Sequence, residues 1–161
     1  MPAVDTNTSA VSNSELYGSF TYSETLKGIY YGPGSVKTAL PKLISTLGVS
    51  KALIVTGRSL HTKTTVVRQV ESVLGPVHGA TFWEIGEHTP VAGIRAGIKA
   101  LEDIGADVII SVGGGSPIDA AKAIVYYYHQ NSEGAKGRWL HHIGIPTTLS
   151  AAEYTVRDDS M

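Results

Sequence analysis

The sequence predicts an α/β fold, with a Rossmann-like, mostly parallel sheet and helices on both faces. First, short apolar runs typical of buried strands alternate with segments whose apolar residues recur at helical spacing. Second, the connections between these segments are short, which favours a parallel sheet. Third, glycine-rich or threonine-rich loops follow three of the strands. Open parallel sheets bind ligands beyond the carboxyl ends of their strands, so these loops mark the expected binding edge.

The composition is that of one well-cored domain of ordinary size. The chain has 161 residues, of which 42% are hydrophobic and 17% charged, and its formal net charge is −1. This balance argues against a nucleic-acid partner, and the lack of cysteine excludes disulfides and thiolate sites. The sequence has neither a secretory signal nor an apolar run long enough for a membrane span. We expect a cytoplasmic protein with a flexible polar tail at residues 1–18 and the α/β domain at residues 19–161.

After the tail, the chain is expected to form a small ribbon and a helix. Ser19–Tyr22 and Gly28–Tyr31 are rich in aromatic and β-branched residues, which predicts two short strands at one edge. Ser35 is placed to cap a helix that ends at Gly48. Pro41 lies inside that helical pattern and is expected to kink or split it.

The central part of the chain is expected to alternate buried strands with amphipathic helices. The predicted strands are Lys51–Thr56, Val77–Ile85, Asp107–Val112 and, after the polar loop Asn131–Arg138, Leu140–Ile145. The predicted helices run from about Thr64 to Leu74, from Thr89–Pro90 to Gly105, and from Ser116 to about Gln130.

The strongest local signal is the stretch S-V-G-G-G-S-P-I-D-A-A-K-A-I at Ser111–Ile124, where a strand stops at three glycines and a helix begins. Ser116 can cap this helix, and Asp119 follows at capping-box spacing. Backbone N–H groups in such a turn, together with a helix N-terminus, can hold a phosphate. The fingerprint G-x-G-x-x-G is only half met, because Ile118 occupies the third glycine position. The glycines therefore indicate either a phosphate-binding loop or a turn that tight strand–helix contact requires.

Several motifs together resemble the iron-containing (group III) alcohol dehydrogenase family. They are G-G-G-S-P-I-D-A-A-K at Gly113–Lys122, I-P-T-T at Ile145–Thr148, Glu153, G-S-V-K-T-A-L-P at Gly34–Pro41 and A-L-I-V-T-G-R-S-L at Ala52–Leu60. The resemblance runs from about Ser19 to Thr155 and covers only the N-terminal nucleotide-binding domain of the family. The short spacing between Thr148 and Glu153 is more similar to the maleylacetate reductase branch.

The resemblance implies an NAD(P)-dependent oxidoreductase of the alcohol dehydrogenase or aldehyde or ketone reductase type. It implies that the dinucleotide is bound by Gly57, Arg58 and Ser59 near the adenosine ribose, by Gly113, Gly114, Gly115 and Ser116 at the pyrophosphate, by Asp119 on the ribose–nicotinamide side, and by Thr147, Thr148, Leu149 and Ser150 around the adenine and pyrophosphate. NAD-preferring relatives often carry an aspartate where this chain has Gly57. A neutral residue beside an arginine suits a 2′-phosphate better, so NADP is favoured over NAD.

The family's metal-binding, C-terminal helical domain is absent from this sequence, which stops at Met161. His141 and His142 are adjacent on a predicted strand and should point to opposite faces, and no other histidines form an i, i+4 pair. We expect no metal site, and we assign no catalytic residue. Turnover by this chain is expected to be weak, and a small alcohol or carbonyl substrate is expected only where a second domain is supplied.

Three alternatives stay open. The chain can instead be a stand-alone or truncated nucleotide-binding module that acts by binding or by self-association, for example as a homodimer. Asp119 and Lys122 lie one helical turn apart and form either an acid–base pair or a surface ion pair. Tyr126–Tyr128 could form a stacking platform, although helical spacing favours core and interface contacts.

Overall fold

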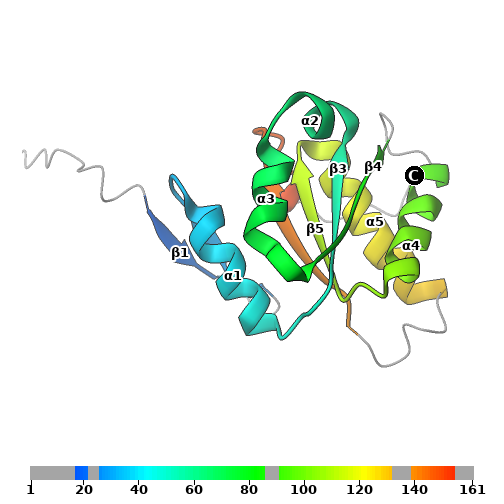
Figure 1. Cartoon of the computed structure of the whole chain (residues 1–161), viewed down its shortest axis with the longest axis horizontal. Coiled ribbons are helices and arrows are strands. Elements are labelled where there is room, and N and C mark those ends of the chain that lie inside the picture. The colour runs from blue at the N-terminus through cyan, green and yellow to red at the C-terminus, as the bar shows by residue number, and fades with distance from the viewer. Residues whose placement is uncertain (1–16, 22–25, 86–90, 132–138, 155–161) are drawn as a thin grey trace, which may run out of the picture.

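A parallel four-stranded sheet in the order β4–β3–β5–β6 forms the centre of the domain (Figure 1). The computed structural model describes residues 17–21, 26–85, 91–131 and 139–154. The strands are β3 (Ala52–Gly57), β4 (His78–Ile85), β5 (Val108–Gly113) and β6 (His141–Pro146). β5 is buried along its whole length and β3 as far as Thr56, because both are central strands covered on two faces. The predicted α/β class is confirmed, and the bounds of the four strands predicted for this sheet each lie within one residue of those observed.

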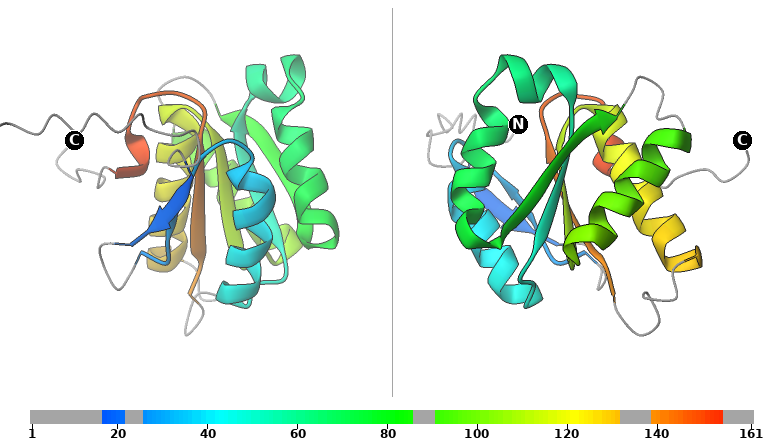
Figure 2. Two further views of the ribbon diagram at one scale, coloured as in Figure 1. Left: turned by 90° about the vertical axis from the view of Figure 1, so that its left-hand side faces the viewer. Right: turned by 45° about the vertical axis from the view of Figure 1, so that its right-hand side comes forward.

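Helices cover both faces of this sheet, with α1 and α3 on one face and α4 and α5 on the other (Figure 2). The helices are α1 (Ser35–Leu47), α2 (Arg58–Lys63), α3 (Val66–Leu74), α4 (Val91–Ile104) and α5 (Gly115–Asn131), with 3₁₀ turns η2 (Gly75–Val77) and η4 (Ala152–Tyr154). Successive strand side chains enter opposite cores. Leu53 lies in the α4–α5 core, whereas Ile54 lies in the α1–α3 core.

The predicted ribbon forms a separate sheet beside α1 (Figure 1). Its strands, β1 (Gly18–Phe20) and β2 (Ile29–Tyr31), pair antiparallel. β1 begins at the last residue of the predicted tail, and residues 1–16 lie outside the described residues.

Two expectations about helix starts are wrong. α1 is capped by Gly34, whose φ of 77° is left-handed, and Ser35 is the first helical residue. α5 begins at Gly115, so Ser116 lies inside its first turn, and Asp119 forms an ion pair with Lys122 instead of a capping box. At Gly34 the left-handed backbone favours glycine, which adopts it without a side-chain clash.

Pro41 does not split α1, which continues from Ser35 to Leu47 and ends at Gly48 as predicted. The short helix α2 had no counterpart in the sequence prediction, because six residues with one apolar side chain give no helical period. The predicted helix start at Thr89–Pro90, and the loop before β6 apart from Asn131, lie outside the described residues. None of the described helices combines the length and the apolar character that crossing a membrane requires.

Hydrogen bonds tie β3 to β5 at both ends of their pairing. At the amino edge, the Asp107 carboxylate accepts hydrogen bonds from the backbone N–H groups of Ser50 and Lys51 and from the Ser50 hydroxyl, at 2.9–3.1 Å. At the carboxyl end, the buried Thr56 hydroxyl donates to the Val112 carbonyl at 2.8 Å. These contacts fix the register that brings the ends of β3 and β5 to one edge.

Candidate functional site

The strand order reverses between β3 and β5, because the chain passes from β3 to β4 on one side and then to β5 on the other. In open α/β sheets, ligands bind outside the carboxyl ends of the strands at such a point. β3 ends at Gly57, and β5 ends at Gly113. The topology alone therefore places two of the predicted loops at the expected binding edge.

A cleft of about 600 Å³ lies at this edge. Its lining comes from the ends of all four strands and consists of Gly57, Arg58, Ser59, Leu60, Trp83, Glu84, Ile85, Gly113, Gly114, Ser116, Pro117 and Thr147. The volume falls within the range of small-molecule sites. The fold thus brings the three predicted loops around one cavity.

Five of the predicted site residues do not line this cleft: Gly115, Asp119, Thr148, Leu149 and Ser150. Two of them pack against the glycine loop: a Cβ on Gly114 would lie 3.1 Å from Thr148, and one on Gly115 would lie 3.7 Å from Ser150. Leu149 is fully exposed, and the Asp119 side chain is about half exposed. Their contact with a cofactor remains a prediction.

The glycine loop has a structural requirement of its own. Gly113 has a φ of 146°, and a Cβ there would approach the Pro117 ring to 2.8 Å. The Gly113 carbonyl also accepts a hydrogen bond from the Thr147 N–H at 2.8 Å, which joins the loop after β5 to the loop after β6. The close contact between β5 and α5 is therefore sufficient to explain why a glycine is required at position 113. Gly114, in contrast, lines the cleft.

Trp83 and Glu84 belong to the cleft wall but were missed by the sequence prediction. They lie near the end of β4, and the rule that placed the other loops at the carboxyl edge could have found them. Arg58 and Glu84 are the charged side chains among the lining residues. The Arg58 guanidinium carbon lies 5.6 Å from the centre of the Trp83 ring, and His61 stacks on the same ring with centroids 5.4 Å apart and planes 9° apart.

A polar cluster lies behind the cleft, between β5, β6 and α5. Ser111 Oγ and His142 Nε2 are 2.8 Å apart. Burial and, less strongly, the charge of Lys122 lower the pKa of His142 to about 4, so this imidazole is neutral at pH 7. Lys122 Nζ lies 2.8 Å from Asp119 Oδ1 and donates to the Ala152 carbonyl at 2.9 Å, which links α5 to η4. Asp119 and Lys122 therefore form an ion pair in this structure.

The tyrosines of α5 face different environments. Tyr128 is buried in the α4–α5 core, Tyr127 is partly buried against it, and Tyr126 is exposed and contacts the Tyr127 ring edge-on. The expectation of core contact is confirmed for Tyr128. Within the described ranges, no three His, Asp or Glu side chains form a group that could hold a metal ion.

The fold and the cleft place the chain in the class of Rossmann-like α/β domains, in which ligands bind at the carboxyl ends of a parallel sheet. The chain belongs to the iron-containing alcohol dehydrogenase family, whose family model matches residues 27–156. The resemblance found in the sequence motifs is thereby confirmed.

Individual relatives agree with this assignment. The chain is 40% identical to the bifunctional aldehyde-alcohol dehydrogenase AdhE of Escherichia coli K12 over 106 residues, which cover 64% of this chain and 12% of that protein. It is 31% identical to a maleylacetate reductase of Rhizobium sp. strain MTP-10005 over 84% of this chain and 35% of the relative. The crystal structure of maleylacetate reductase from Agrobacterium tumefaciens superposes with a TM-score of 0.63 at 30% identity, covering 76% of this chain and 31% of that chain. The chain thus spans about a third or less of the length of these relatives.

Proposed function

We propose that this chain binds a dinucleotide at the carboxyl edge of its sheet, as the cofactor-binding part of an alcohol dehydrogenase or an aldehyde or ketone reductase. The observation that carries the proposal is that the loops after β3, β5 and β6 meet around one cleft, which is lined by Gly57–Ser59, Gly113, Gly114, Ser116 and Thr147. Members of the family bind NAD(P), and the relatives are alcohol dehydrogenases and reductases. The bound cofactor supplies the hydride, and the protein binds and orients it.

Each loop takes one part of the dinucleotide. The backbone N–H groups of Gly113–Gly115 hold the pyrophosphate at the start of α5, where the helix dipole favours negative charge. Ser116 adds a hydroxyl at the same place, and Asp119 faces the ribose–nicotinamide side. Thr147–Ser150 line the adenine and pyrophosphate region. No residue of the chain is assigned to proton transfer.

We further propose that NADP(H) is preferred over NAD(H). Gly57 ends β3 without a carboxylate that would accept from a ribose 2′-hydroxyl and repel a 2′-phosphate. Arg58 follows directly, lines the cleft and makes no ion pair with any described residue. A guanidinium can bind a phosphate through two parallel hydrogen bonds, which an ammonium cannot match.

Calorimetric titration of the chain with NADPH and NADH tests both parts of the proposal. NADPH is expected to bind at least about tenfold more tightly, a difference of roughly 1.4 kcal/mol. Arg58→Met should remove most of that difference and leave NADH affinity unchanged. Lys63→Met is the matched control, because this substitution removes one positive charge from the same helix at a residue that does not line the cleft. Tenfold tighter binding of NADH by the wild type would contradict the NADP preference, and binding of neither dinucleotide would overturn the proposed function.

A second candidate is a nucleotide-binding module that acts by self-association without turnover. The observation that favours it is the exposure of large apolar side chains, among them Leu149, Tyr154 and Trp139. Such side chains are typical of surfaces that another chain covers. Light scattering across a concentration series distinguishes the candidates, since self-association predicts a concentration-dependent dimer and the single cofactor domain predicts a monomer.

A further inference from the structure

The indole of Trp83 contacts two basic side chains of α2. Arg58 and His61 lie three residues apart, so they share one side of that helix, and both contact the Trp83 ring. The buried Nδ1 atom of His61 has no hydrogen-bond partner within the part of the chain that the structure describes. Ring stacking therefore holds His61 in place, and Trp83 joins α2 to the end of β4.

The contact between Arg58 and Trp83 decides where the charge of Arg58 lies. Glu84, the other charged residue of the cleft lining, follows Trp83 on β4, so its side chain points to the opposite face of the sheet from the indole. None of the ion pairs between described residues joins it to Arg58. The guanidinium lies over the indole instead, within the range in which a cation is attracted to an aromatic face. The contact keeps Arg58 at the cleft wall, and its guanidinium has no ion-pair partner among the described residues.

We propose that Trp83 is a specificity-determining positioning residue, which holds the Arg58 guanidinium at the cleft wall, ready for the 2′-phosphate of NADP(H). This inference rests on the proposed function and deepens it by assigning the selectivity to a side-chain arrangement instead of to Arg58 alone. Pre-organisation raises affinity because the guanidinium does not have to become ordered when the ligand binds. Without the indole, Arg58 has no fixed position at the cleft wall, and the site loses its selectivity.

Dissociation constants for NADPH and NADH, measured on the full chain and its variants, test this arrangement. Trp83→Leu is expected to weaken NADPH binding by about tenfold and to leave NADH binding within about twofold, since the indole acts on the 2′-phosphate through Arg58. Trp83→Phe keeps an aromatic face and should retain most of the selectivity. In the Arg58→Met background, Trp83→Leu should cause no further loss of NADPH affinity, because the indole acts through Arg58. A purely structural role for Trp83 would weaken NADPH binding in that background as well.

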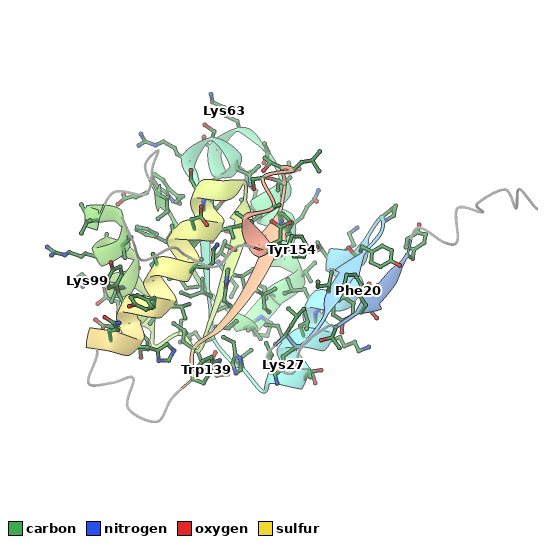
Figure 3. The ribbon with its side chains drawn as sticks, turned by 180° about the vertical axis from the view of Figure 1, so that it is seen from behind. Phe20, Lys27, Lys63, Lys99, Trp139 and Tyr154 are labelled. Carbon is green, nitrogen blue, oxygen red and sulfur yellow. The ribbon has the colours of Figure 1, made fainter. Side chains whose placement is uncertain are left out.

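Fluorescence gives a second measurement that does not depend on the nicotinamide half of the cofactor. The chain has two tryptophans, and Trp139 lies at the opposite end of the sheet from Lys63 of α2 (Figure 3). Trp139→Phe therefore leaves Trp83 as the single tryptophan reporter. Adenosine 2′,5′-bisphosphate should change the Trp83 emission at a lower concentration than 5′-AMP does, because only the bisphosphate carries the 2′-phosphate that Arg58 would bind.

The outcomes separate this inference from the proposed function. If the wild type prefers NADPH and Trp83→Leu keeps the same preference, the inference is overturned while the proposed function stands. Equal weakening of NADPH and NADH, with thermal unfolding unchanged, also overturns it, since Trp83 would then support the cleft in general. If the wild type binds neither dinucleotide nor either adenosine nucleotide, the proposed function falls and this inference falls with it.

Discussion

At the scale of single residues, His142 is a histidine that the fold keeps neutral. It lies between Ser111, which shares a hydrogen bond with it, and the positive charge of Lys122. Protonation would place a second positive charge in the same partly buried cluster. An unfolded chain has no such penalty, since its histidines titrate at their ordinary pKa of about 6.5.

His142 makes the free energy of unfolding depend on pH. Because its pKa falls to about 4 in the folded state, the unfolded state binds more protons between pH 4 and pH 6.5. The stabilisation is complete above about pH 6.5 and is lost as the pH falls toward 4, by on the order of 2–3 kcal/mol in total. Urea unfolding at several pH values should show this loss, and His142→Gln should reduce it. His141→Gln, which changes the neighbouring residue of β6, is the control. An unaltered pH profile in His142→Gln would contradict the prediction.

Residue-level features of the site could be predicted unevenly from the sequence. The place of Gly57–Ser59 and Gly113–Ser116 at the sheet edge was predictable, because glycines at the ends of apolar runs mark turns through local sequence alone. The carboxyl-edge rule could also have placed Trp83 there, but it could not have assigned a role to that side chain, since an aromatic residue near the end of a strand is equally typical of a core position. The contact of Trp83 with Arg58 depends on how α2 returns over β4, and no local pattern encodes it.

At the scale of elements, α1 contains a proline in its interior and stays continuous. Pro41 cannot donate a backbone hydrogen bond to the carbonyl of Lys37, one turn earlier. The side chain is exposed beside the groove between α1 and α3, so replacing it removes little apolar contact. Replacing Pro41 with a residue that has a backbone N–H should therefore restore this hydrogen bond and stabilise the helix.

Pro41→Ala is expected to stabilise the chain by about 1–2 kcal/mol, part of the roughly 3 kcal/mol by which proline is disfavoured inside a helix. The urea midpoint should rise, with an unchanged dependence on urea concentration. Lys37→Ala in the same helix is the control, because lysine and alanine differ little in helix preference and the backbone hydrogen bonds stay the same. An equal or lower midpoint for Pro41→Ala would show that the surrounding structure requires the proline.

Strands were more predictable than the starts of helices. β3 and β5 are almost continuous apolar runs, and short runs of this kind are typical of strands that are buried on both faces of a sheet. Helix starts were less certain, because serine and glycine can both occupy the position before the first turn. In α1 the backbone needs a positive φ at Gly34, which overrides the capping preference of Ser35.

At the scale of the whole molecule, the carboxyl ends of the sheet strands and the loops that follow them form the lining of the cleft. The charged side chains that line the cleft are Arg58 and Glu84. We assign Arg58 to the cofactor phosphate, which leaves no cation among the lining residues to polarise a substrate carbonyl. The relatives are more than twice as long as this chain.

The chain is therefore expected to bind NADPH without reducing small aldehydes at an appreciable rate. An assay that follows NADPH absorbance with a series of short-chain aldehydes, in the presence and absence of a chelator, measures this directly. Binding measured on the same preparation is the control for an intact cofactor site. Robust turnover that is insensitive to the chelator would show that the chemistry lies within this cleft.

The hydrogen bonds that join β3 to β5 at both ends connect parts of the chain that are far apart in the sequence. Thr56 and Val112 are 56 positions apart, and β4 and α4 lie between them in the chain. Pairings this distant along the chain close slowly, and meanwhile an apolar strand keeps an open edge. The interval before β5 arrives is when neighbouring copies can join at that edge and aggregate. Slower synthesis or lower temperature should therefore raise the yield of folded protein more than a stabilising surface substitution would.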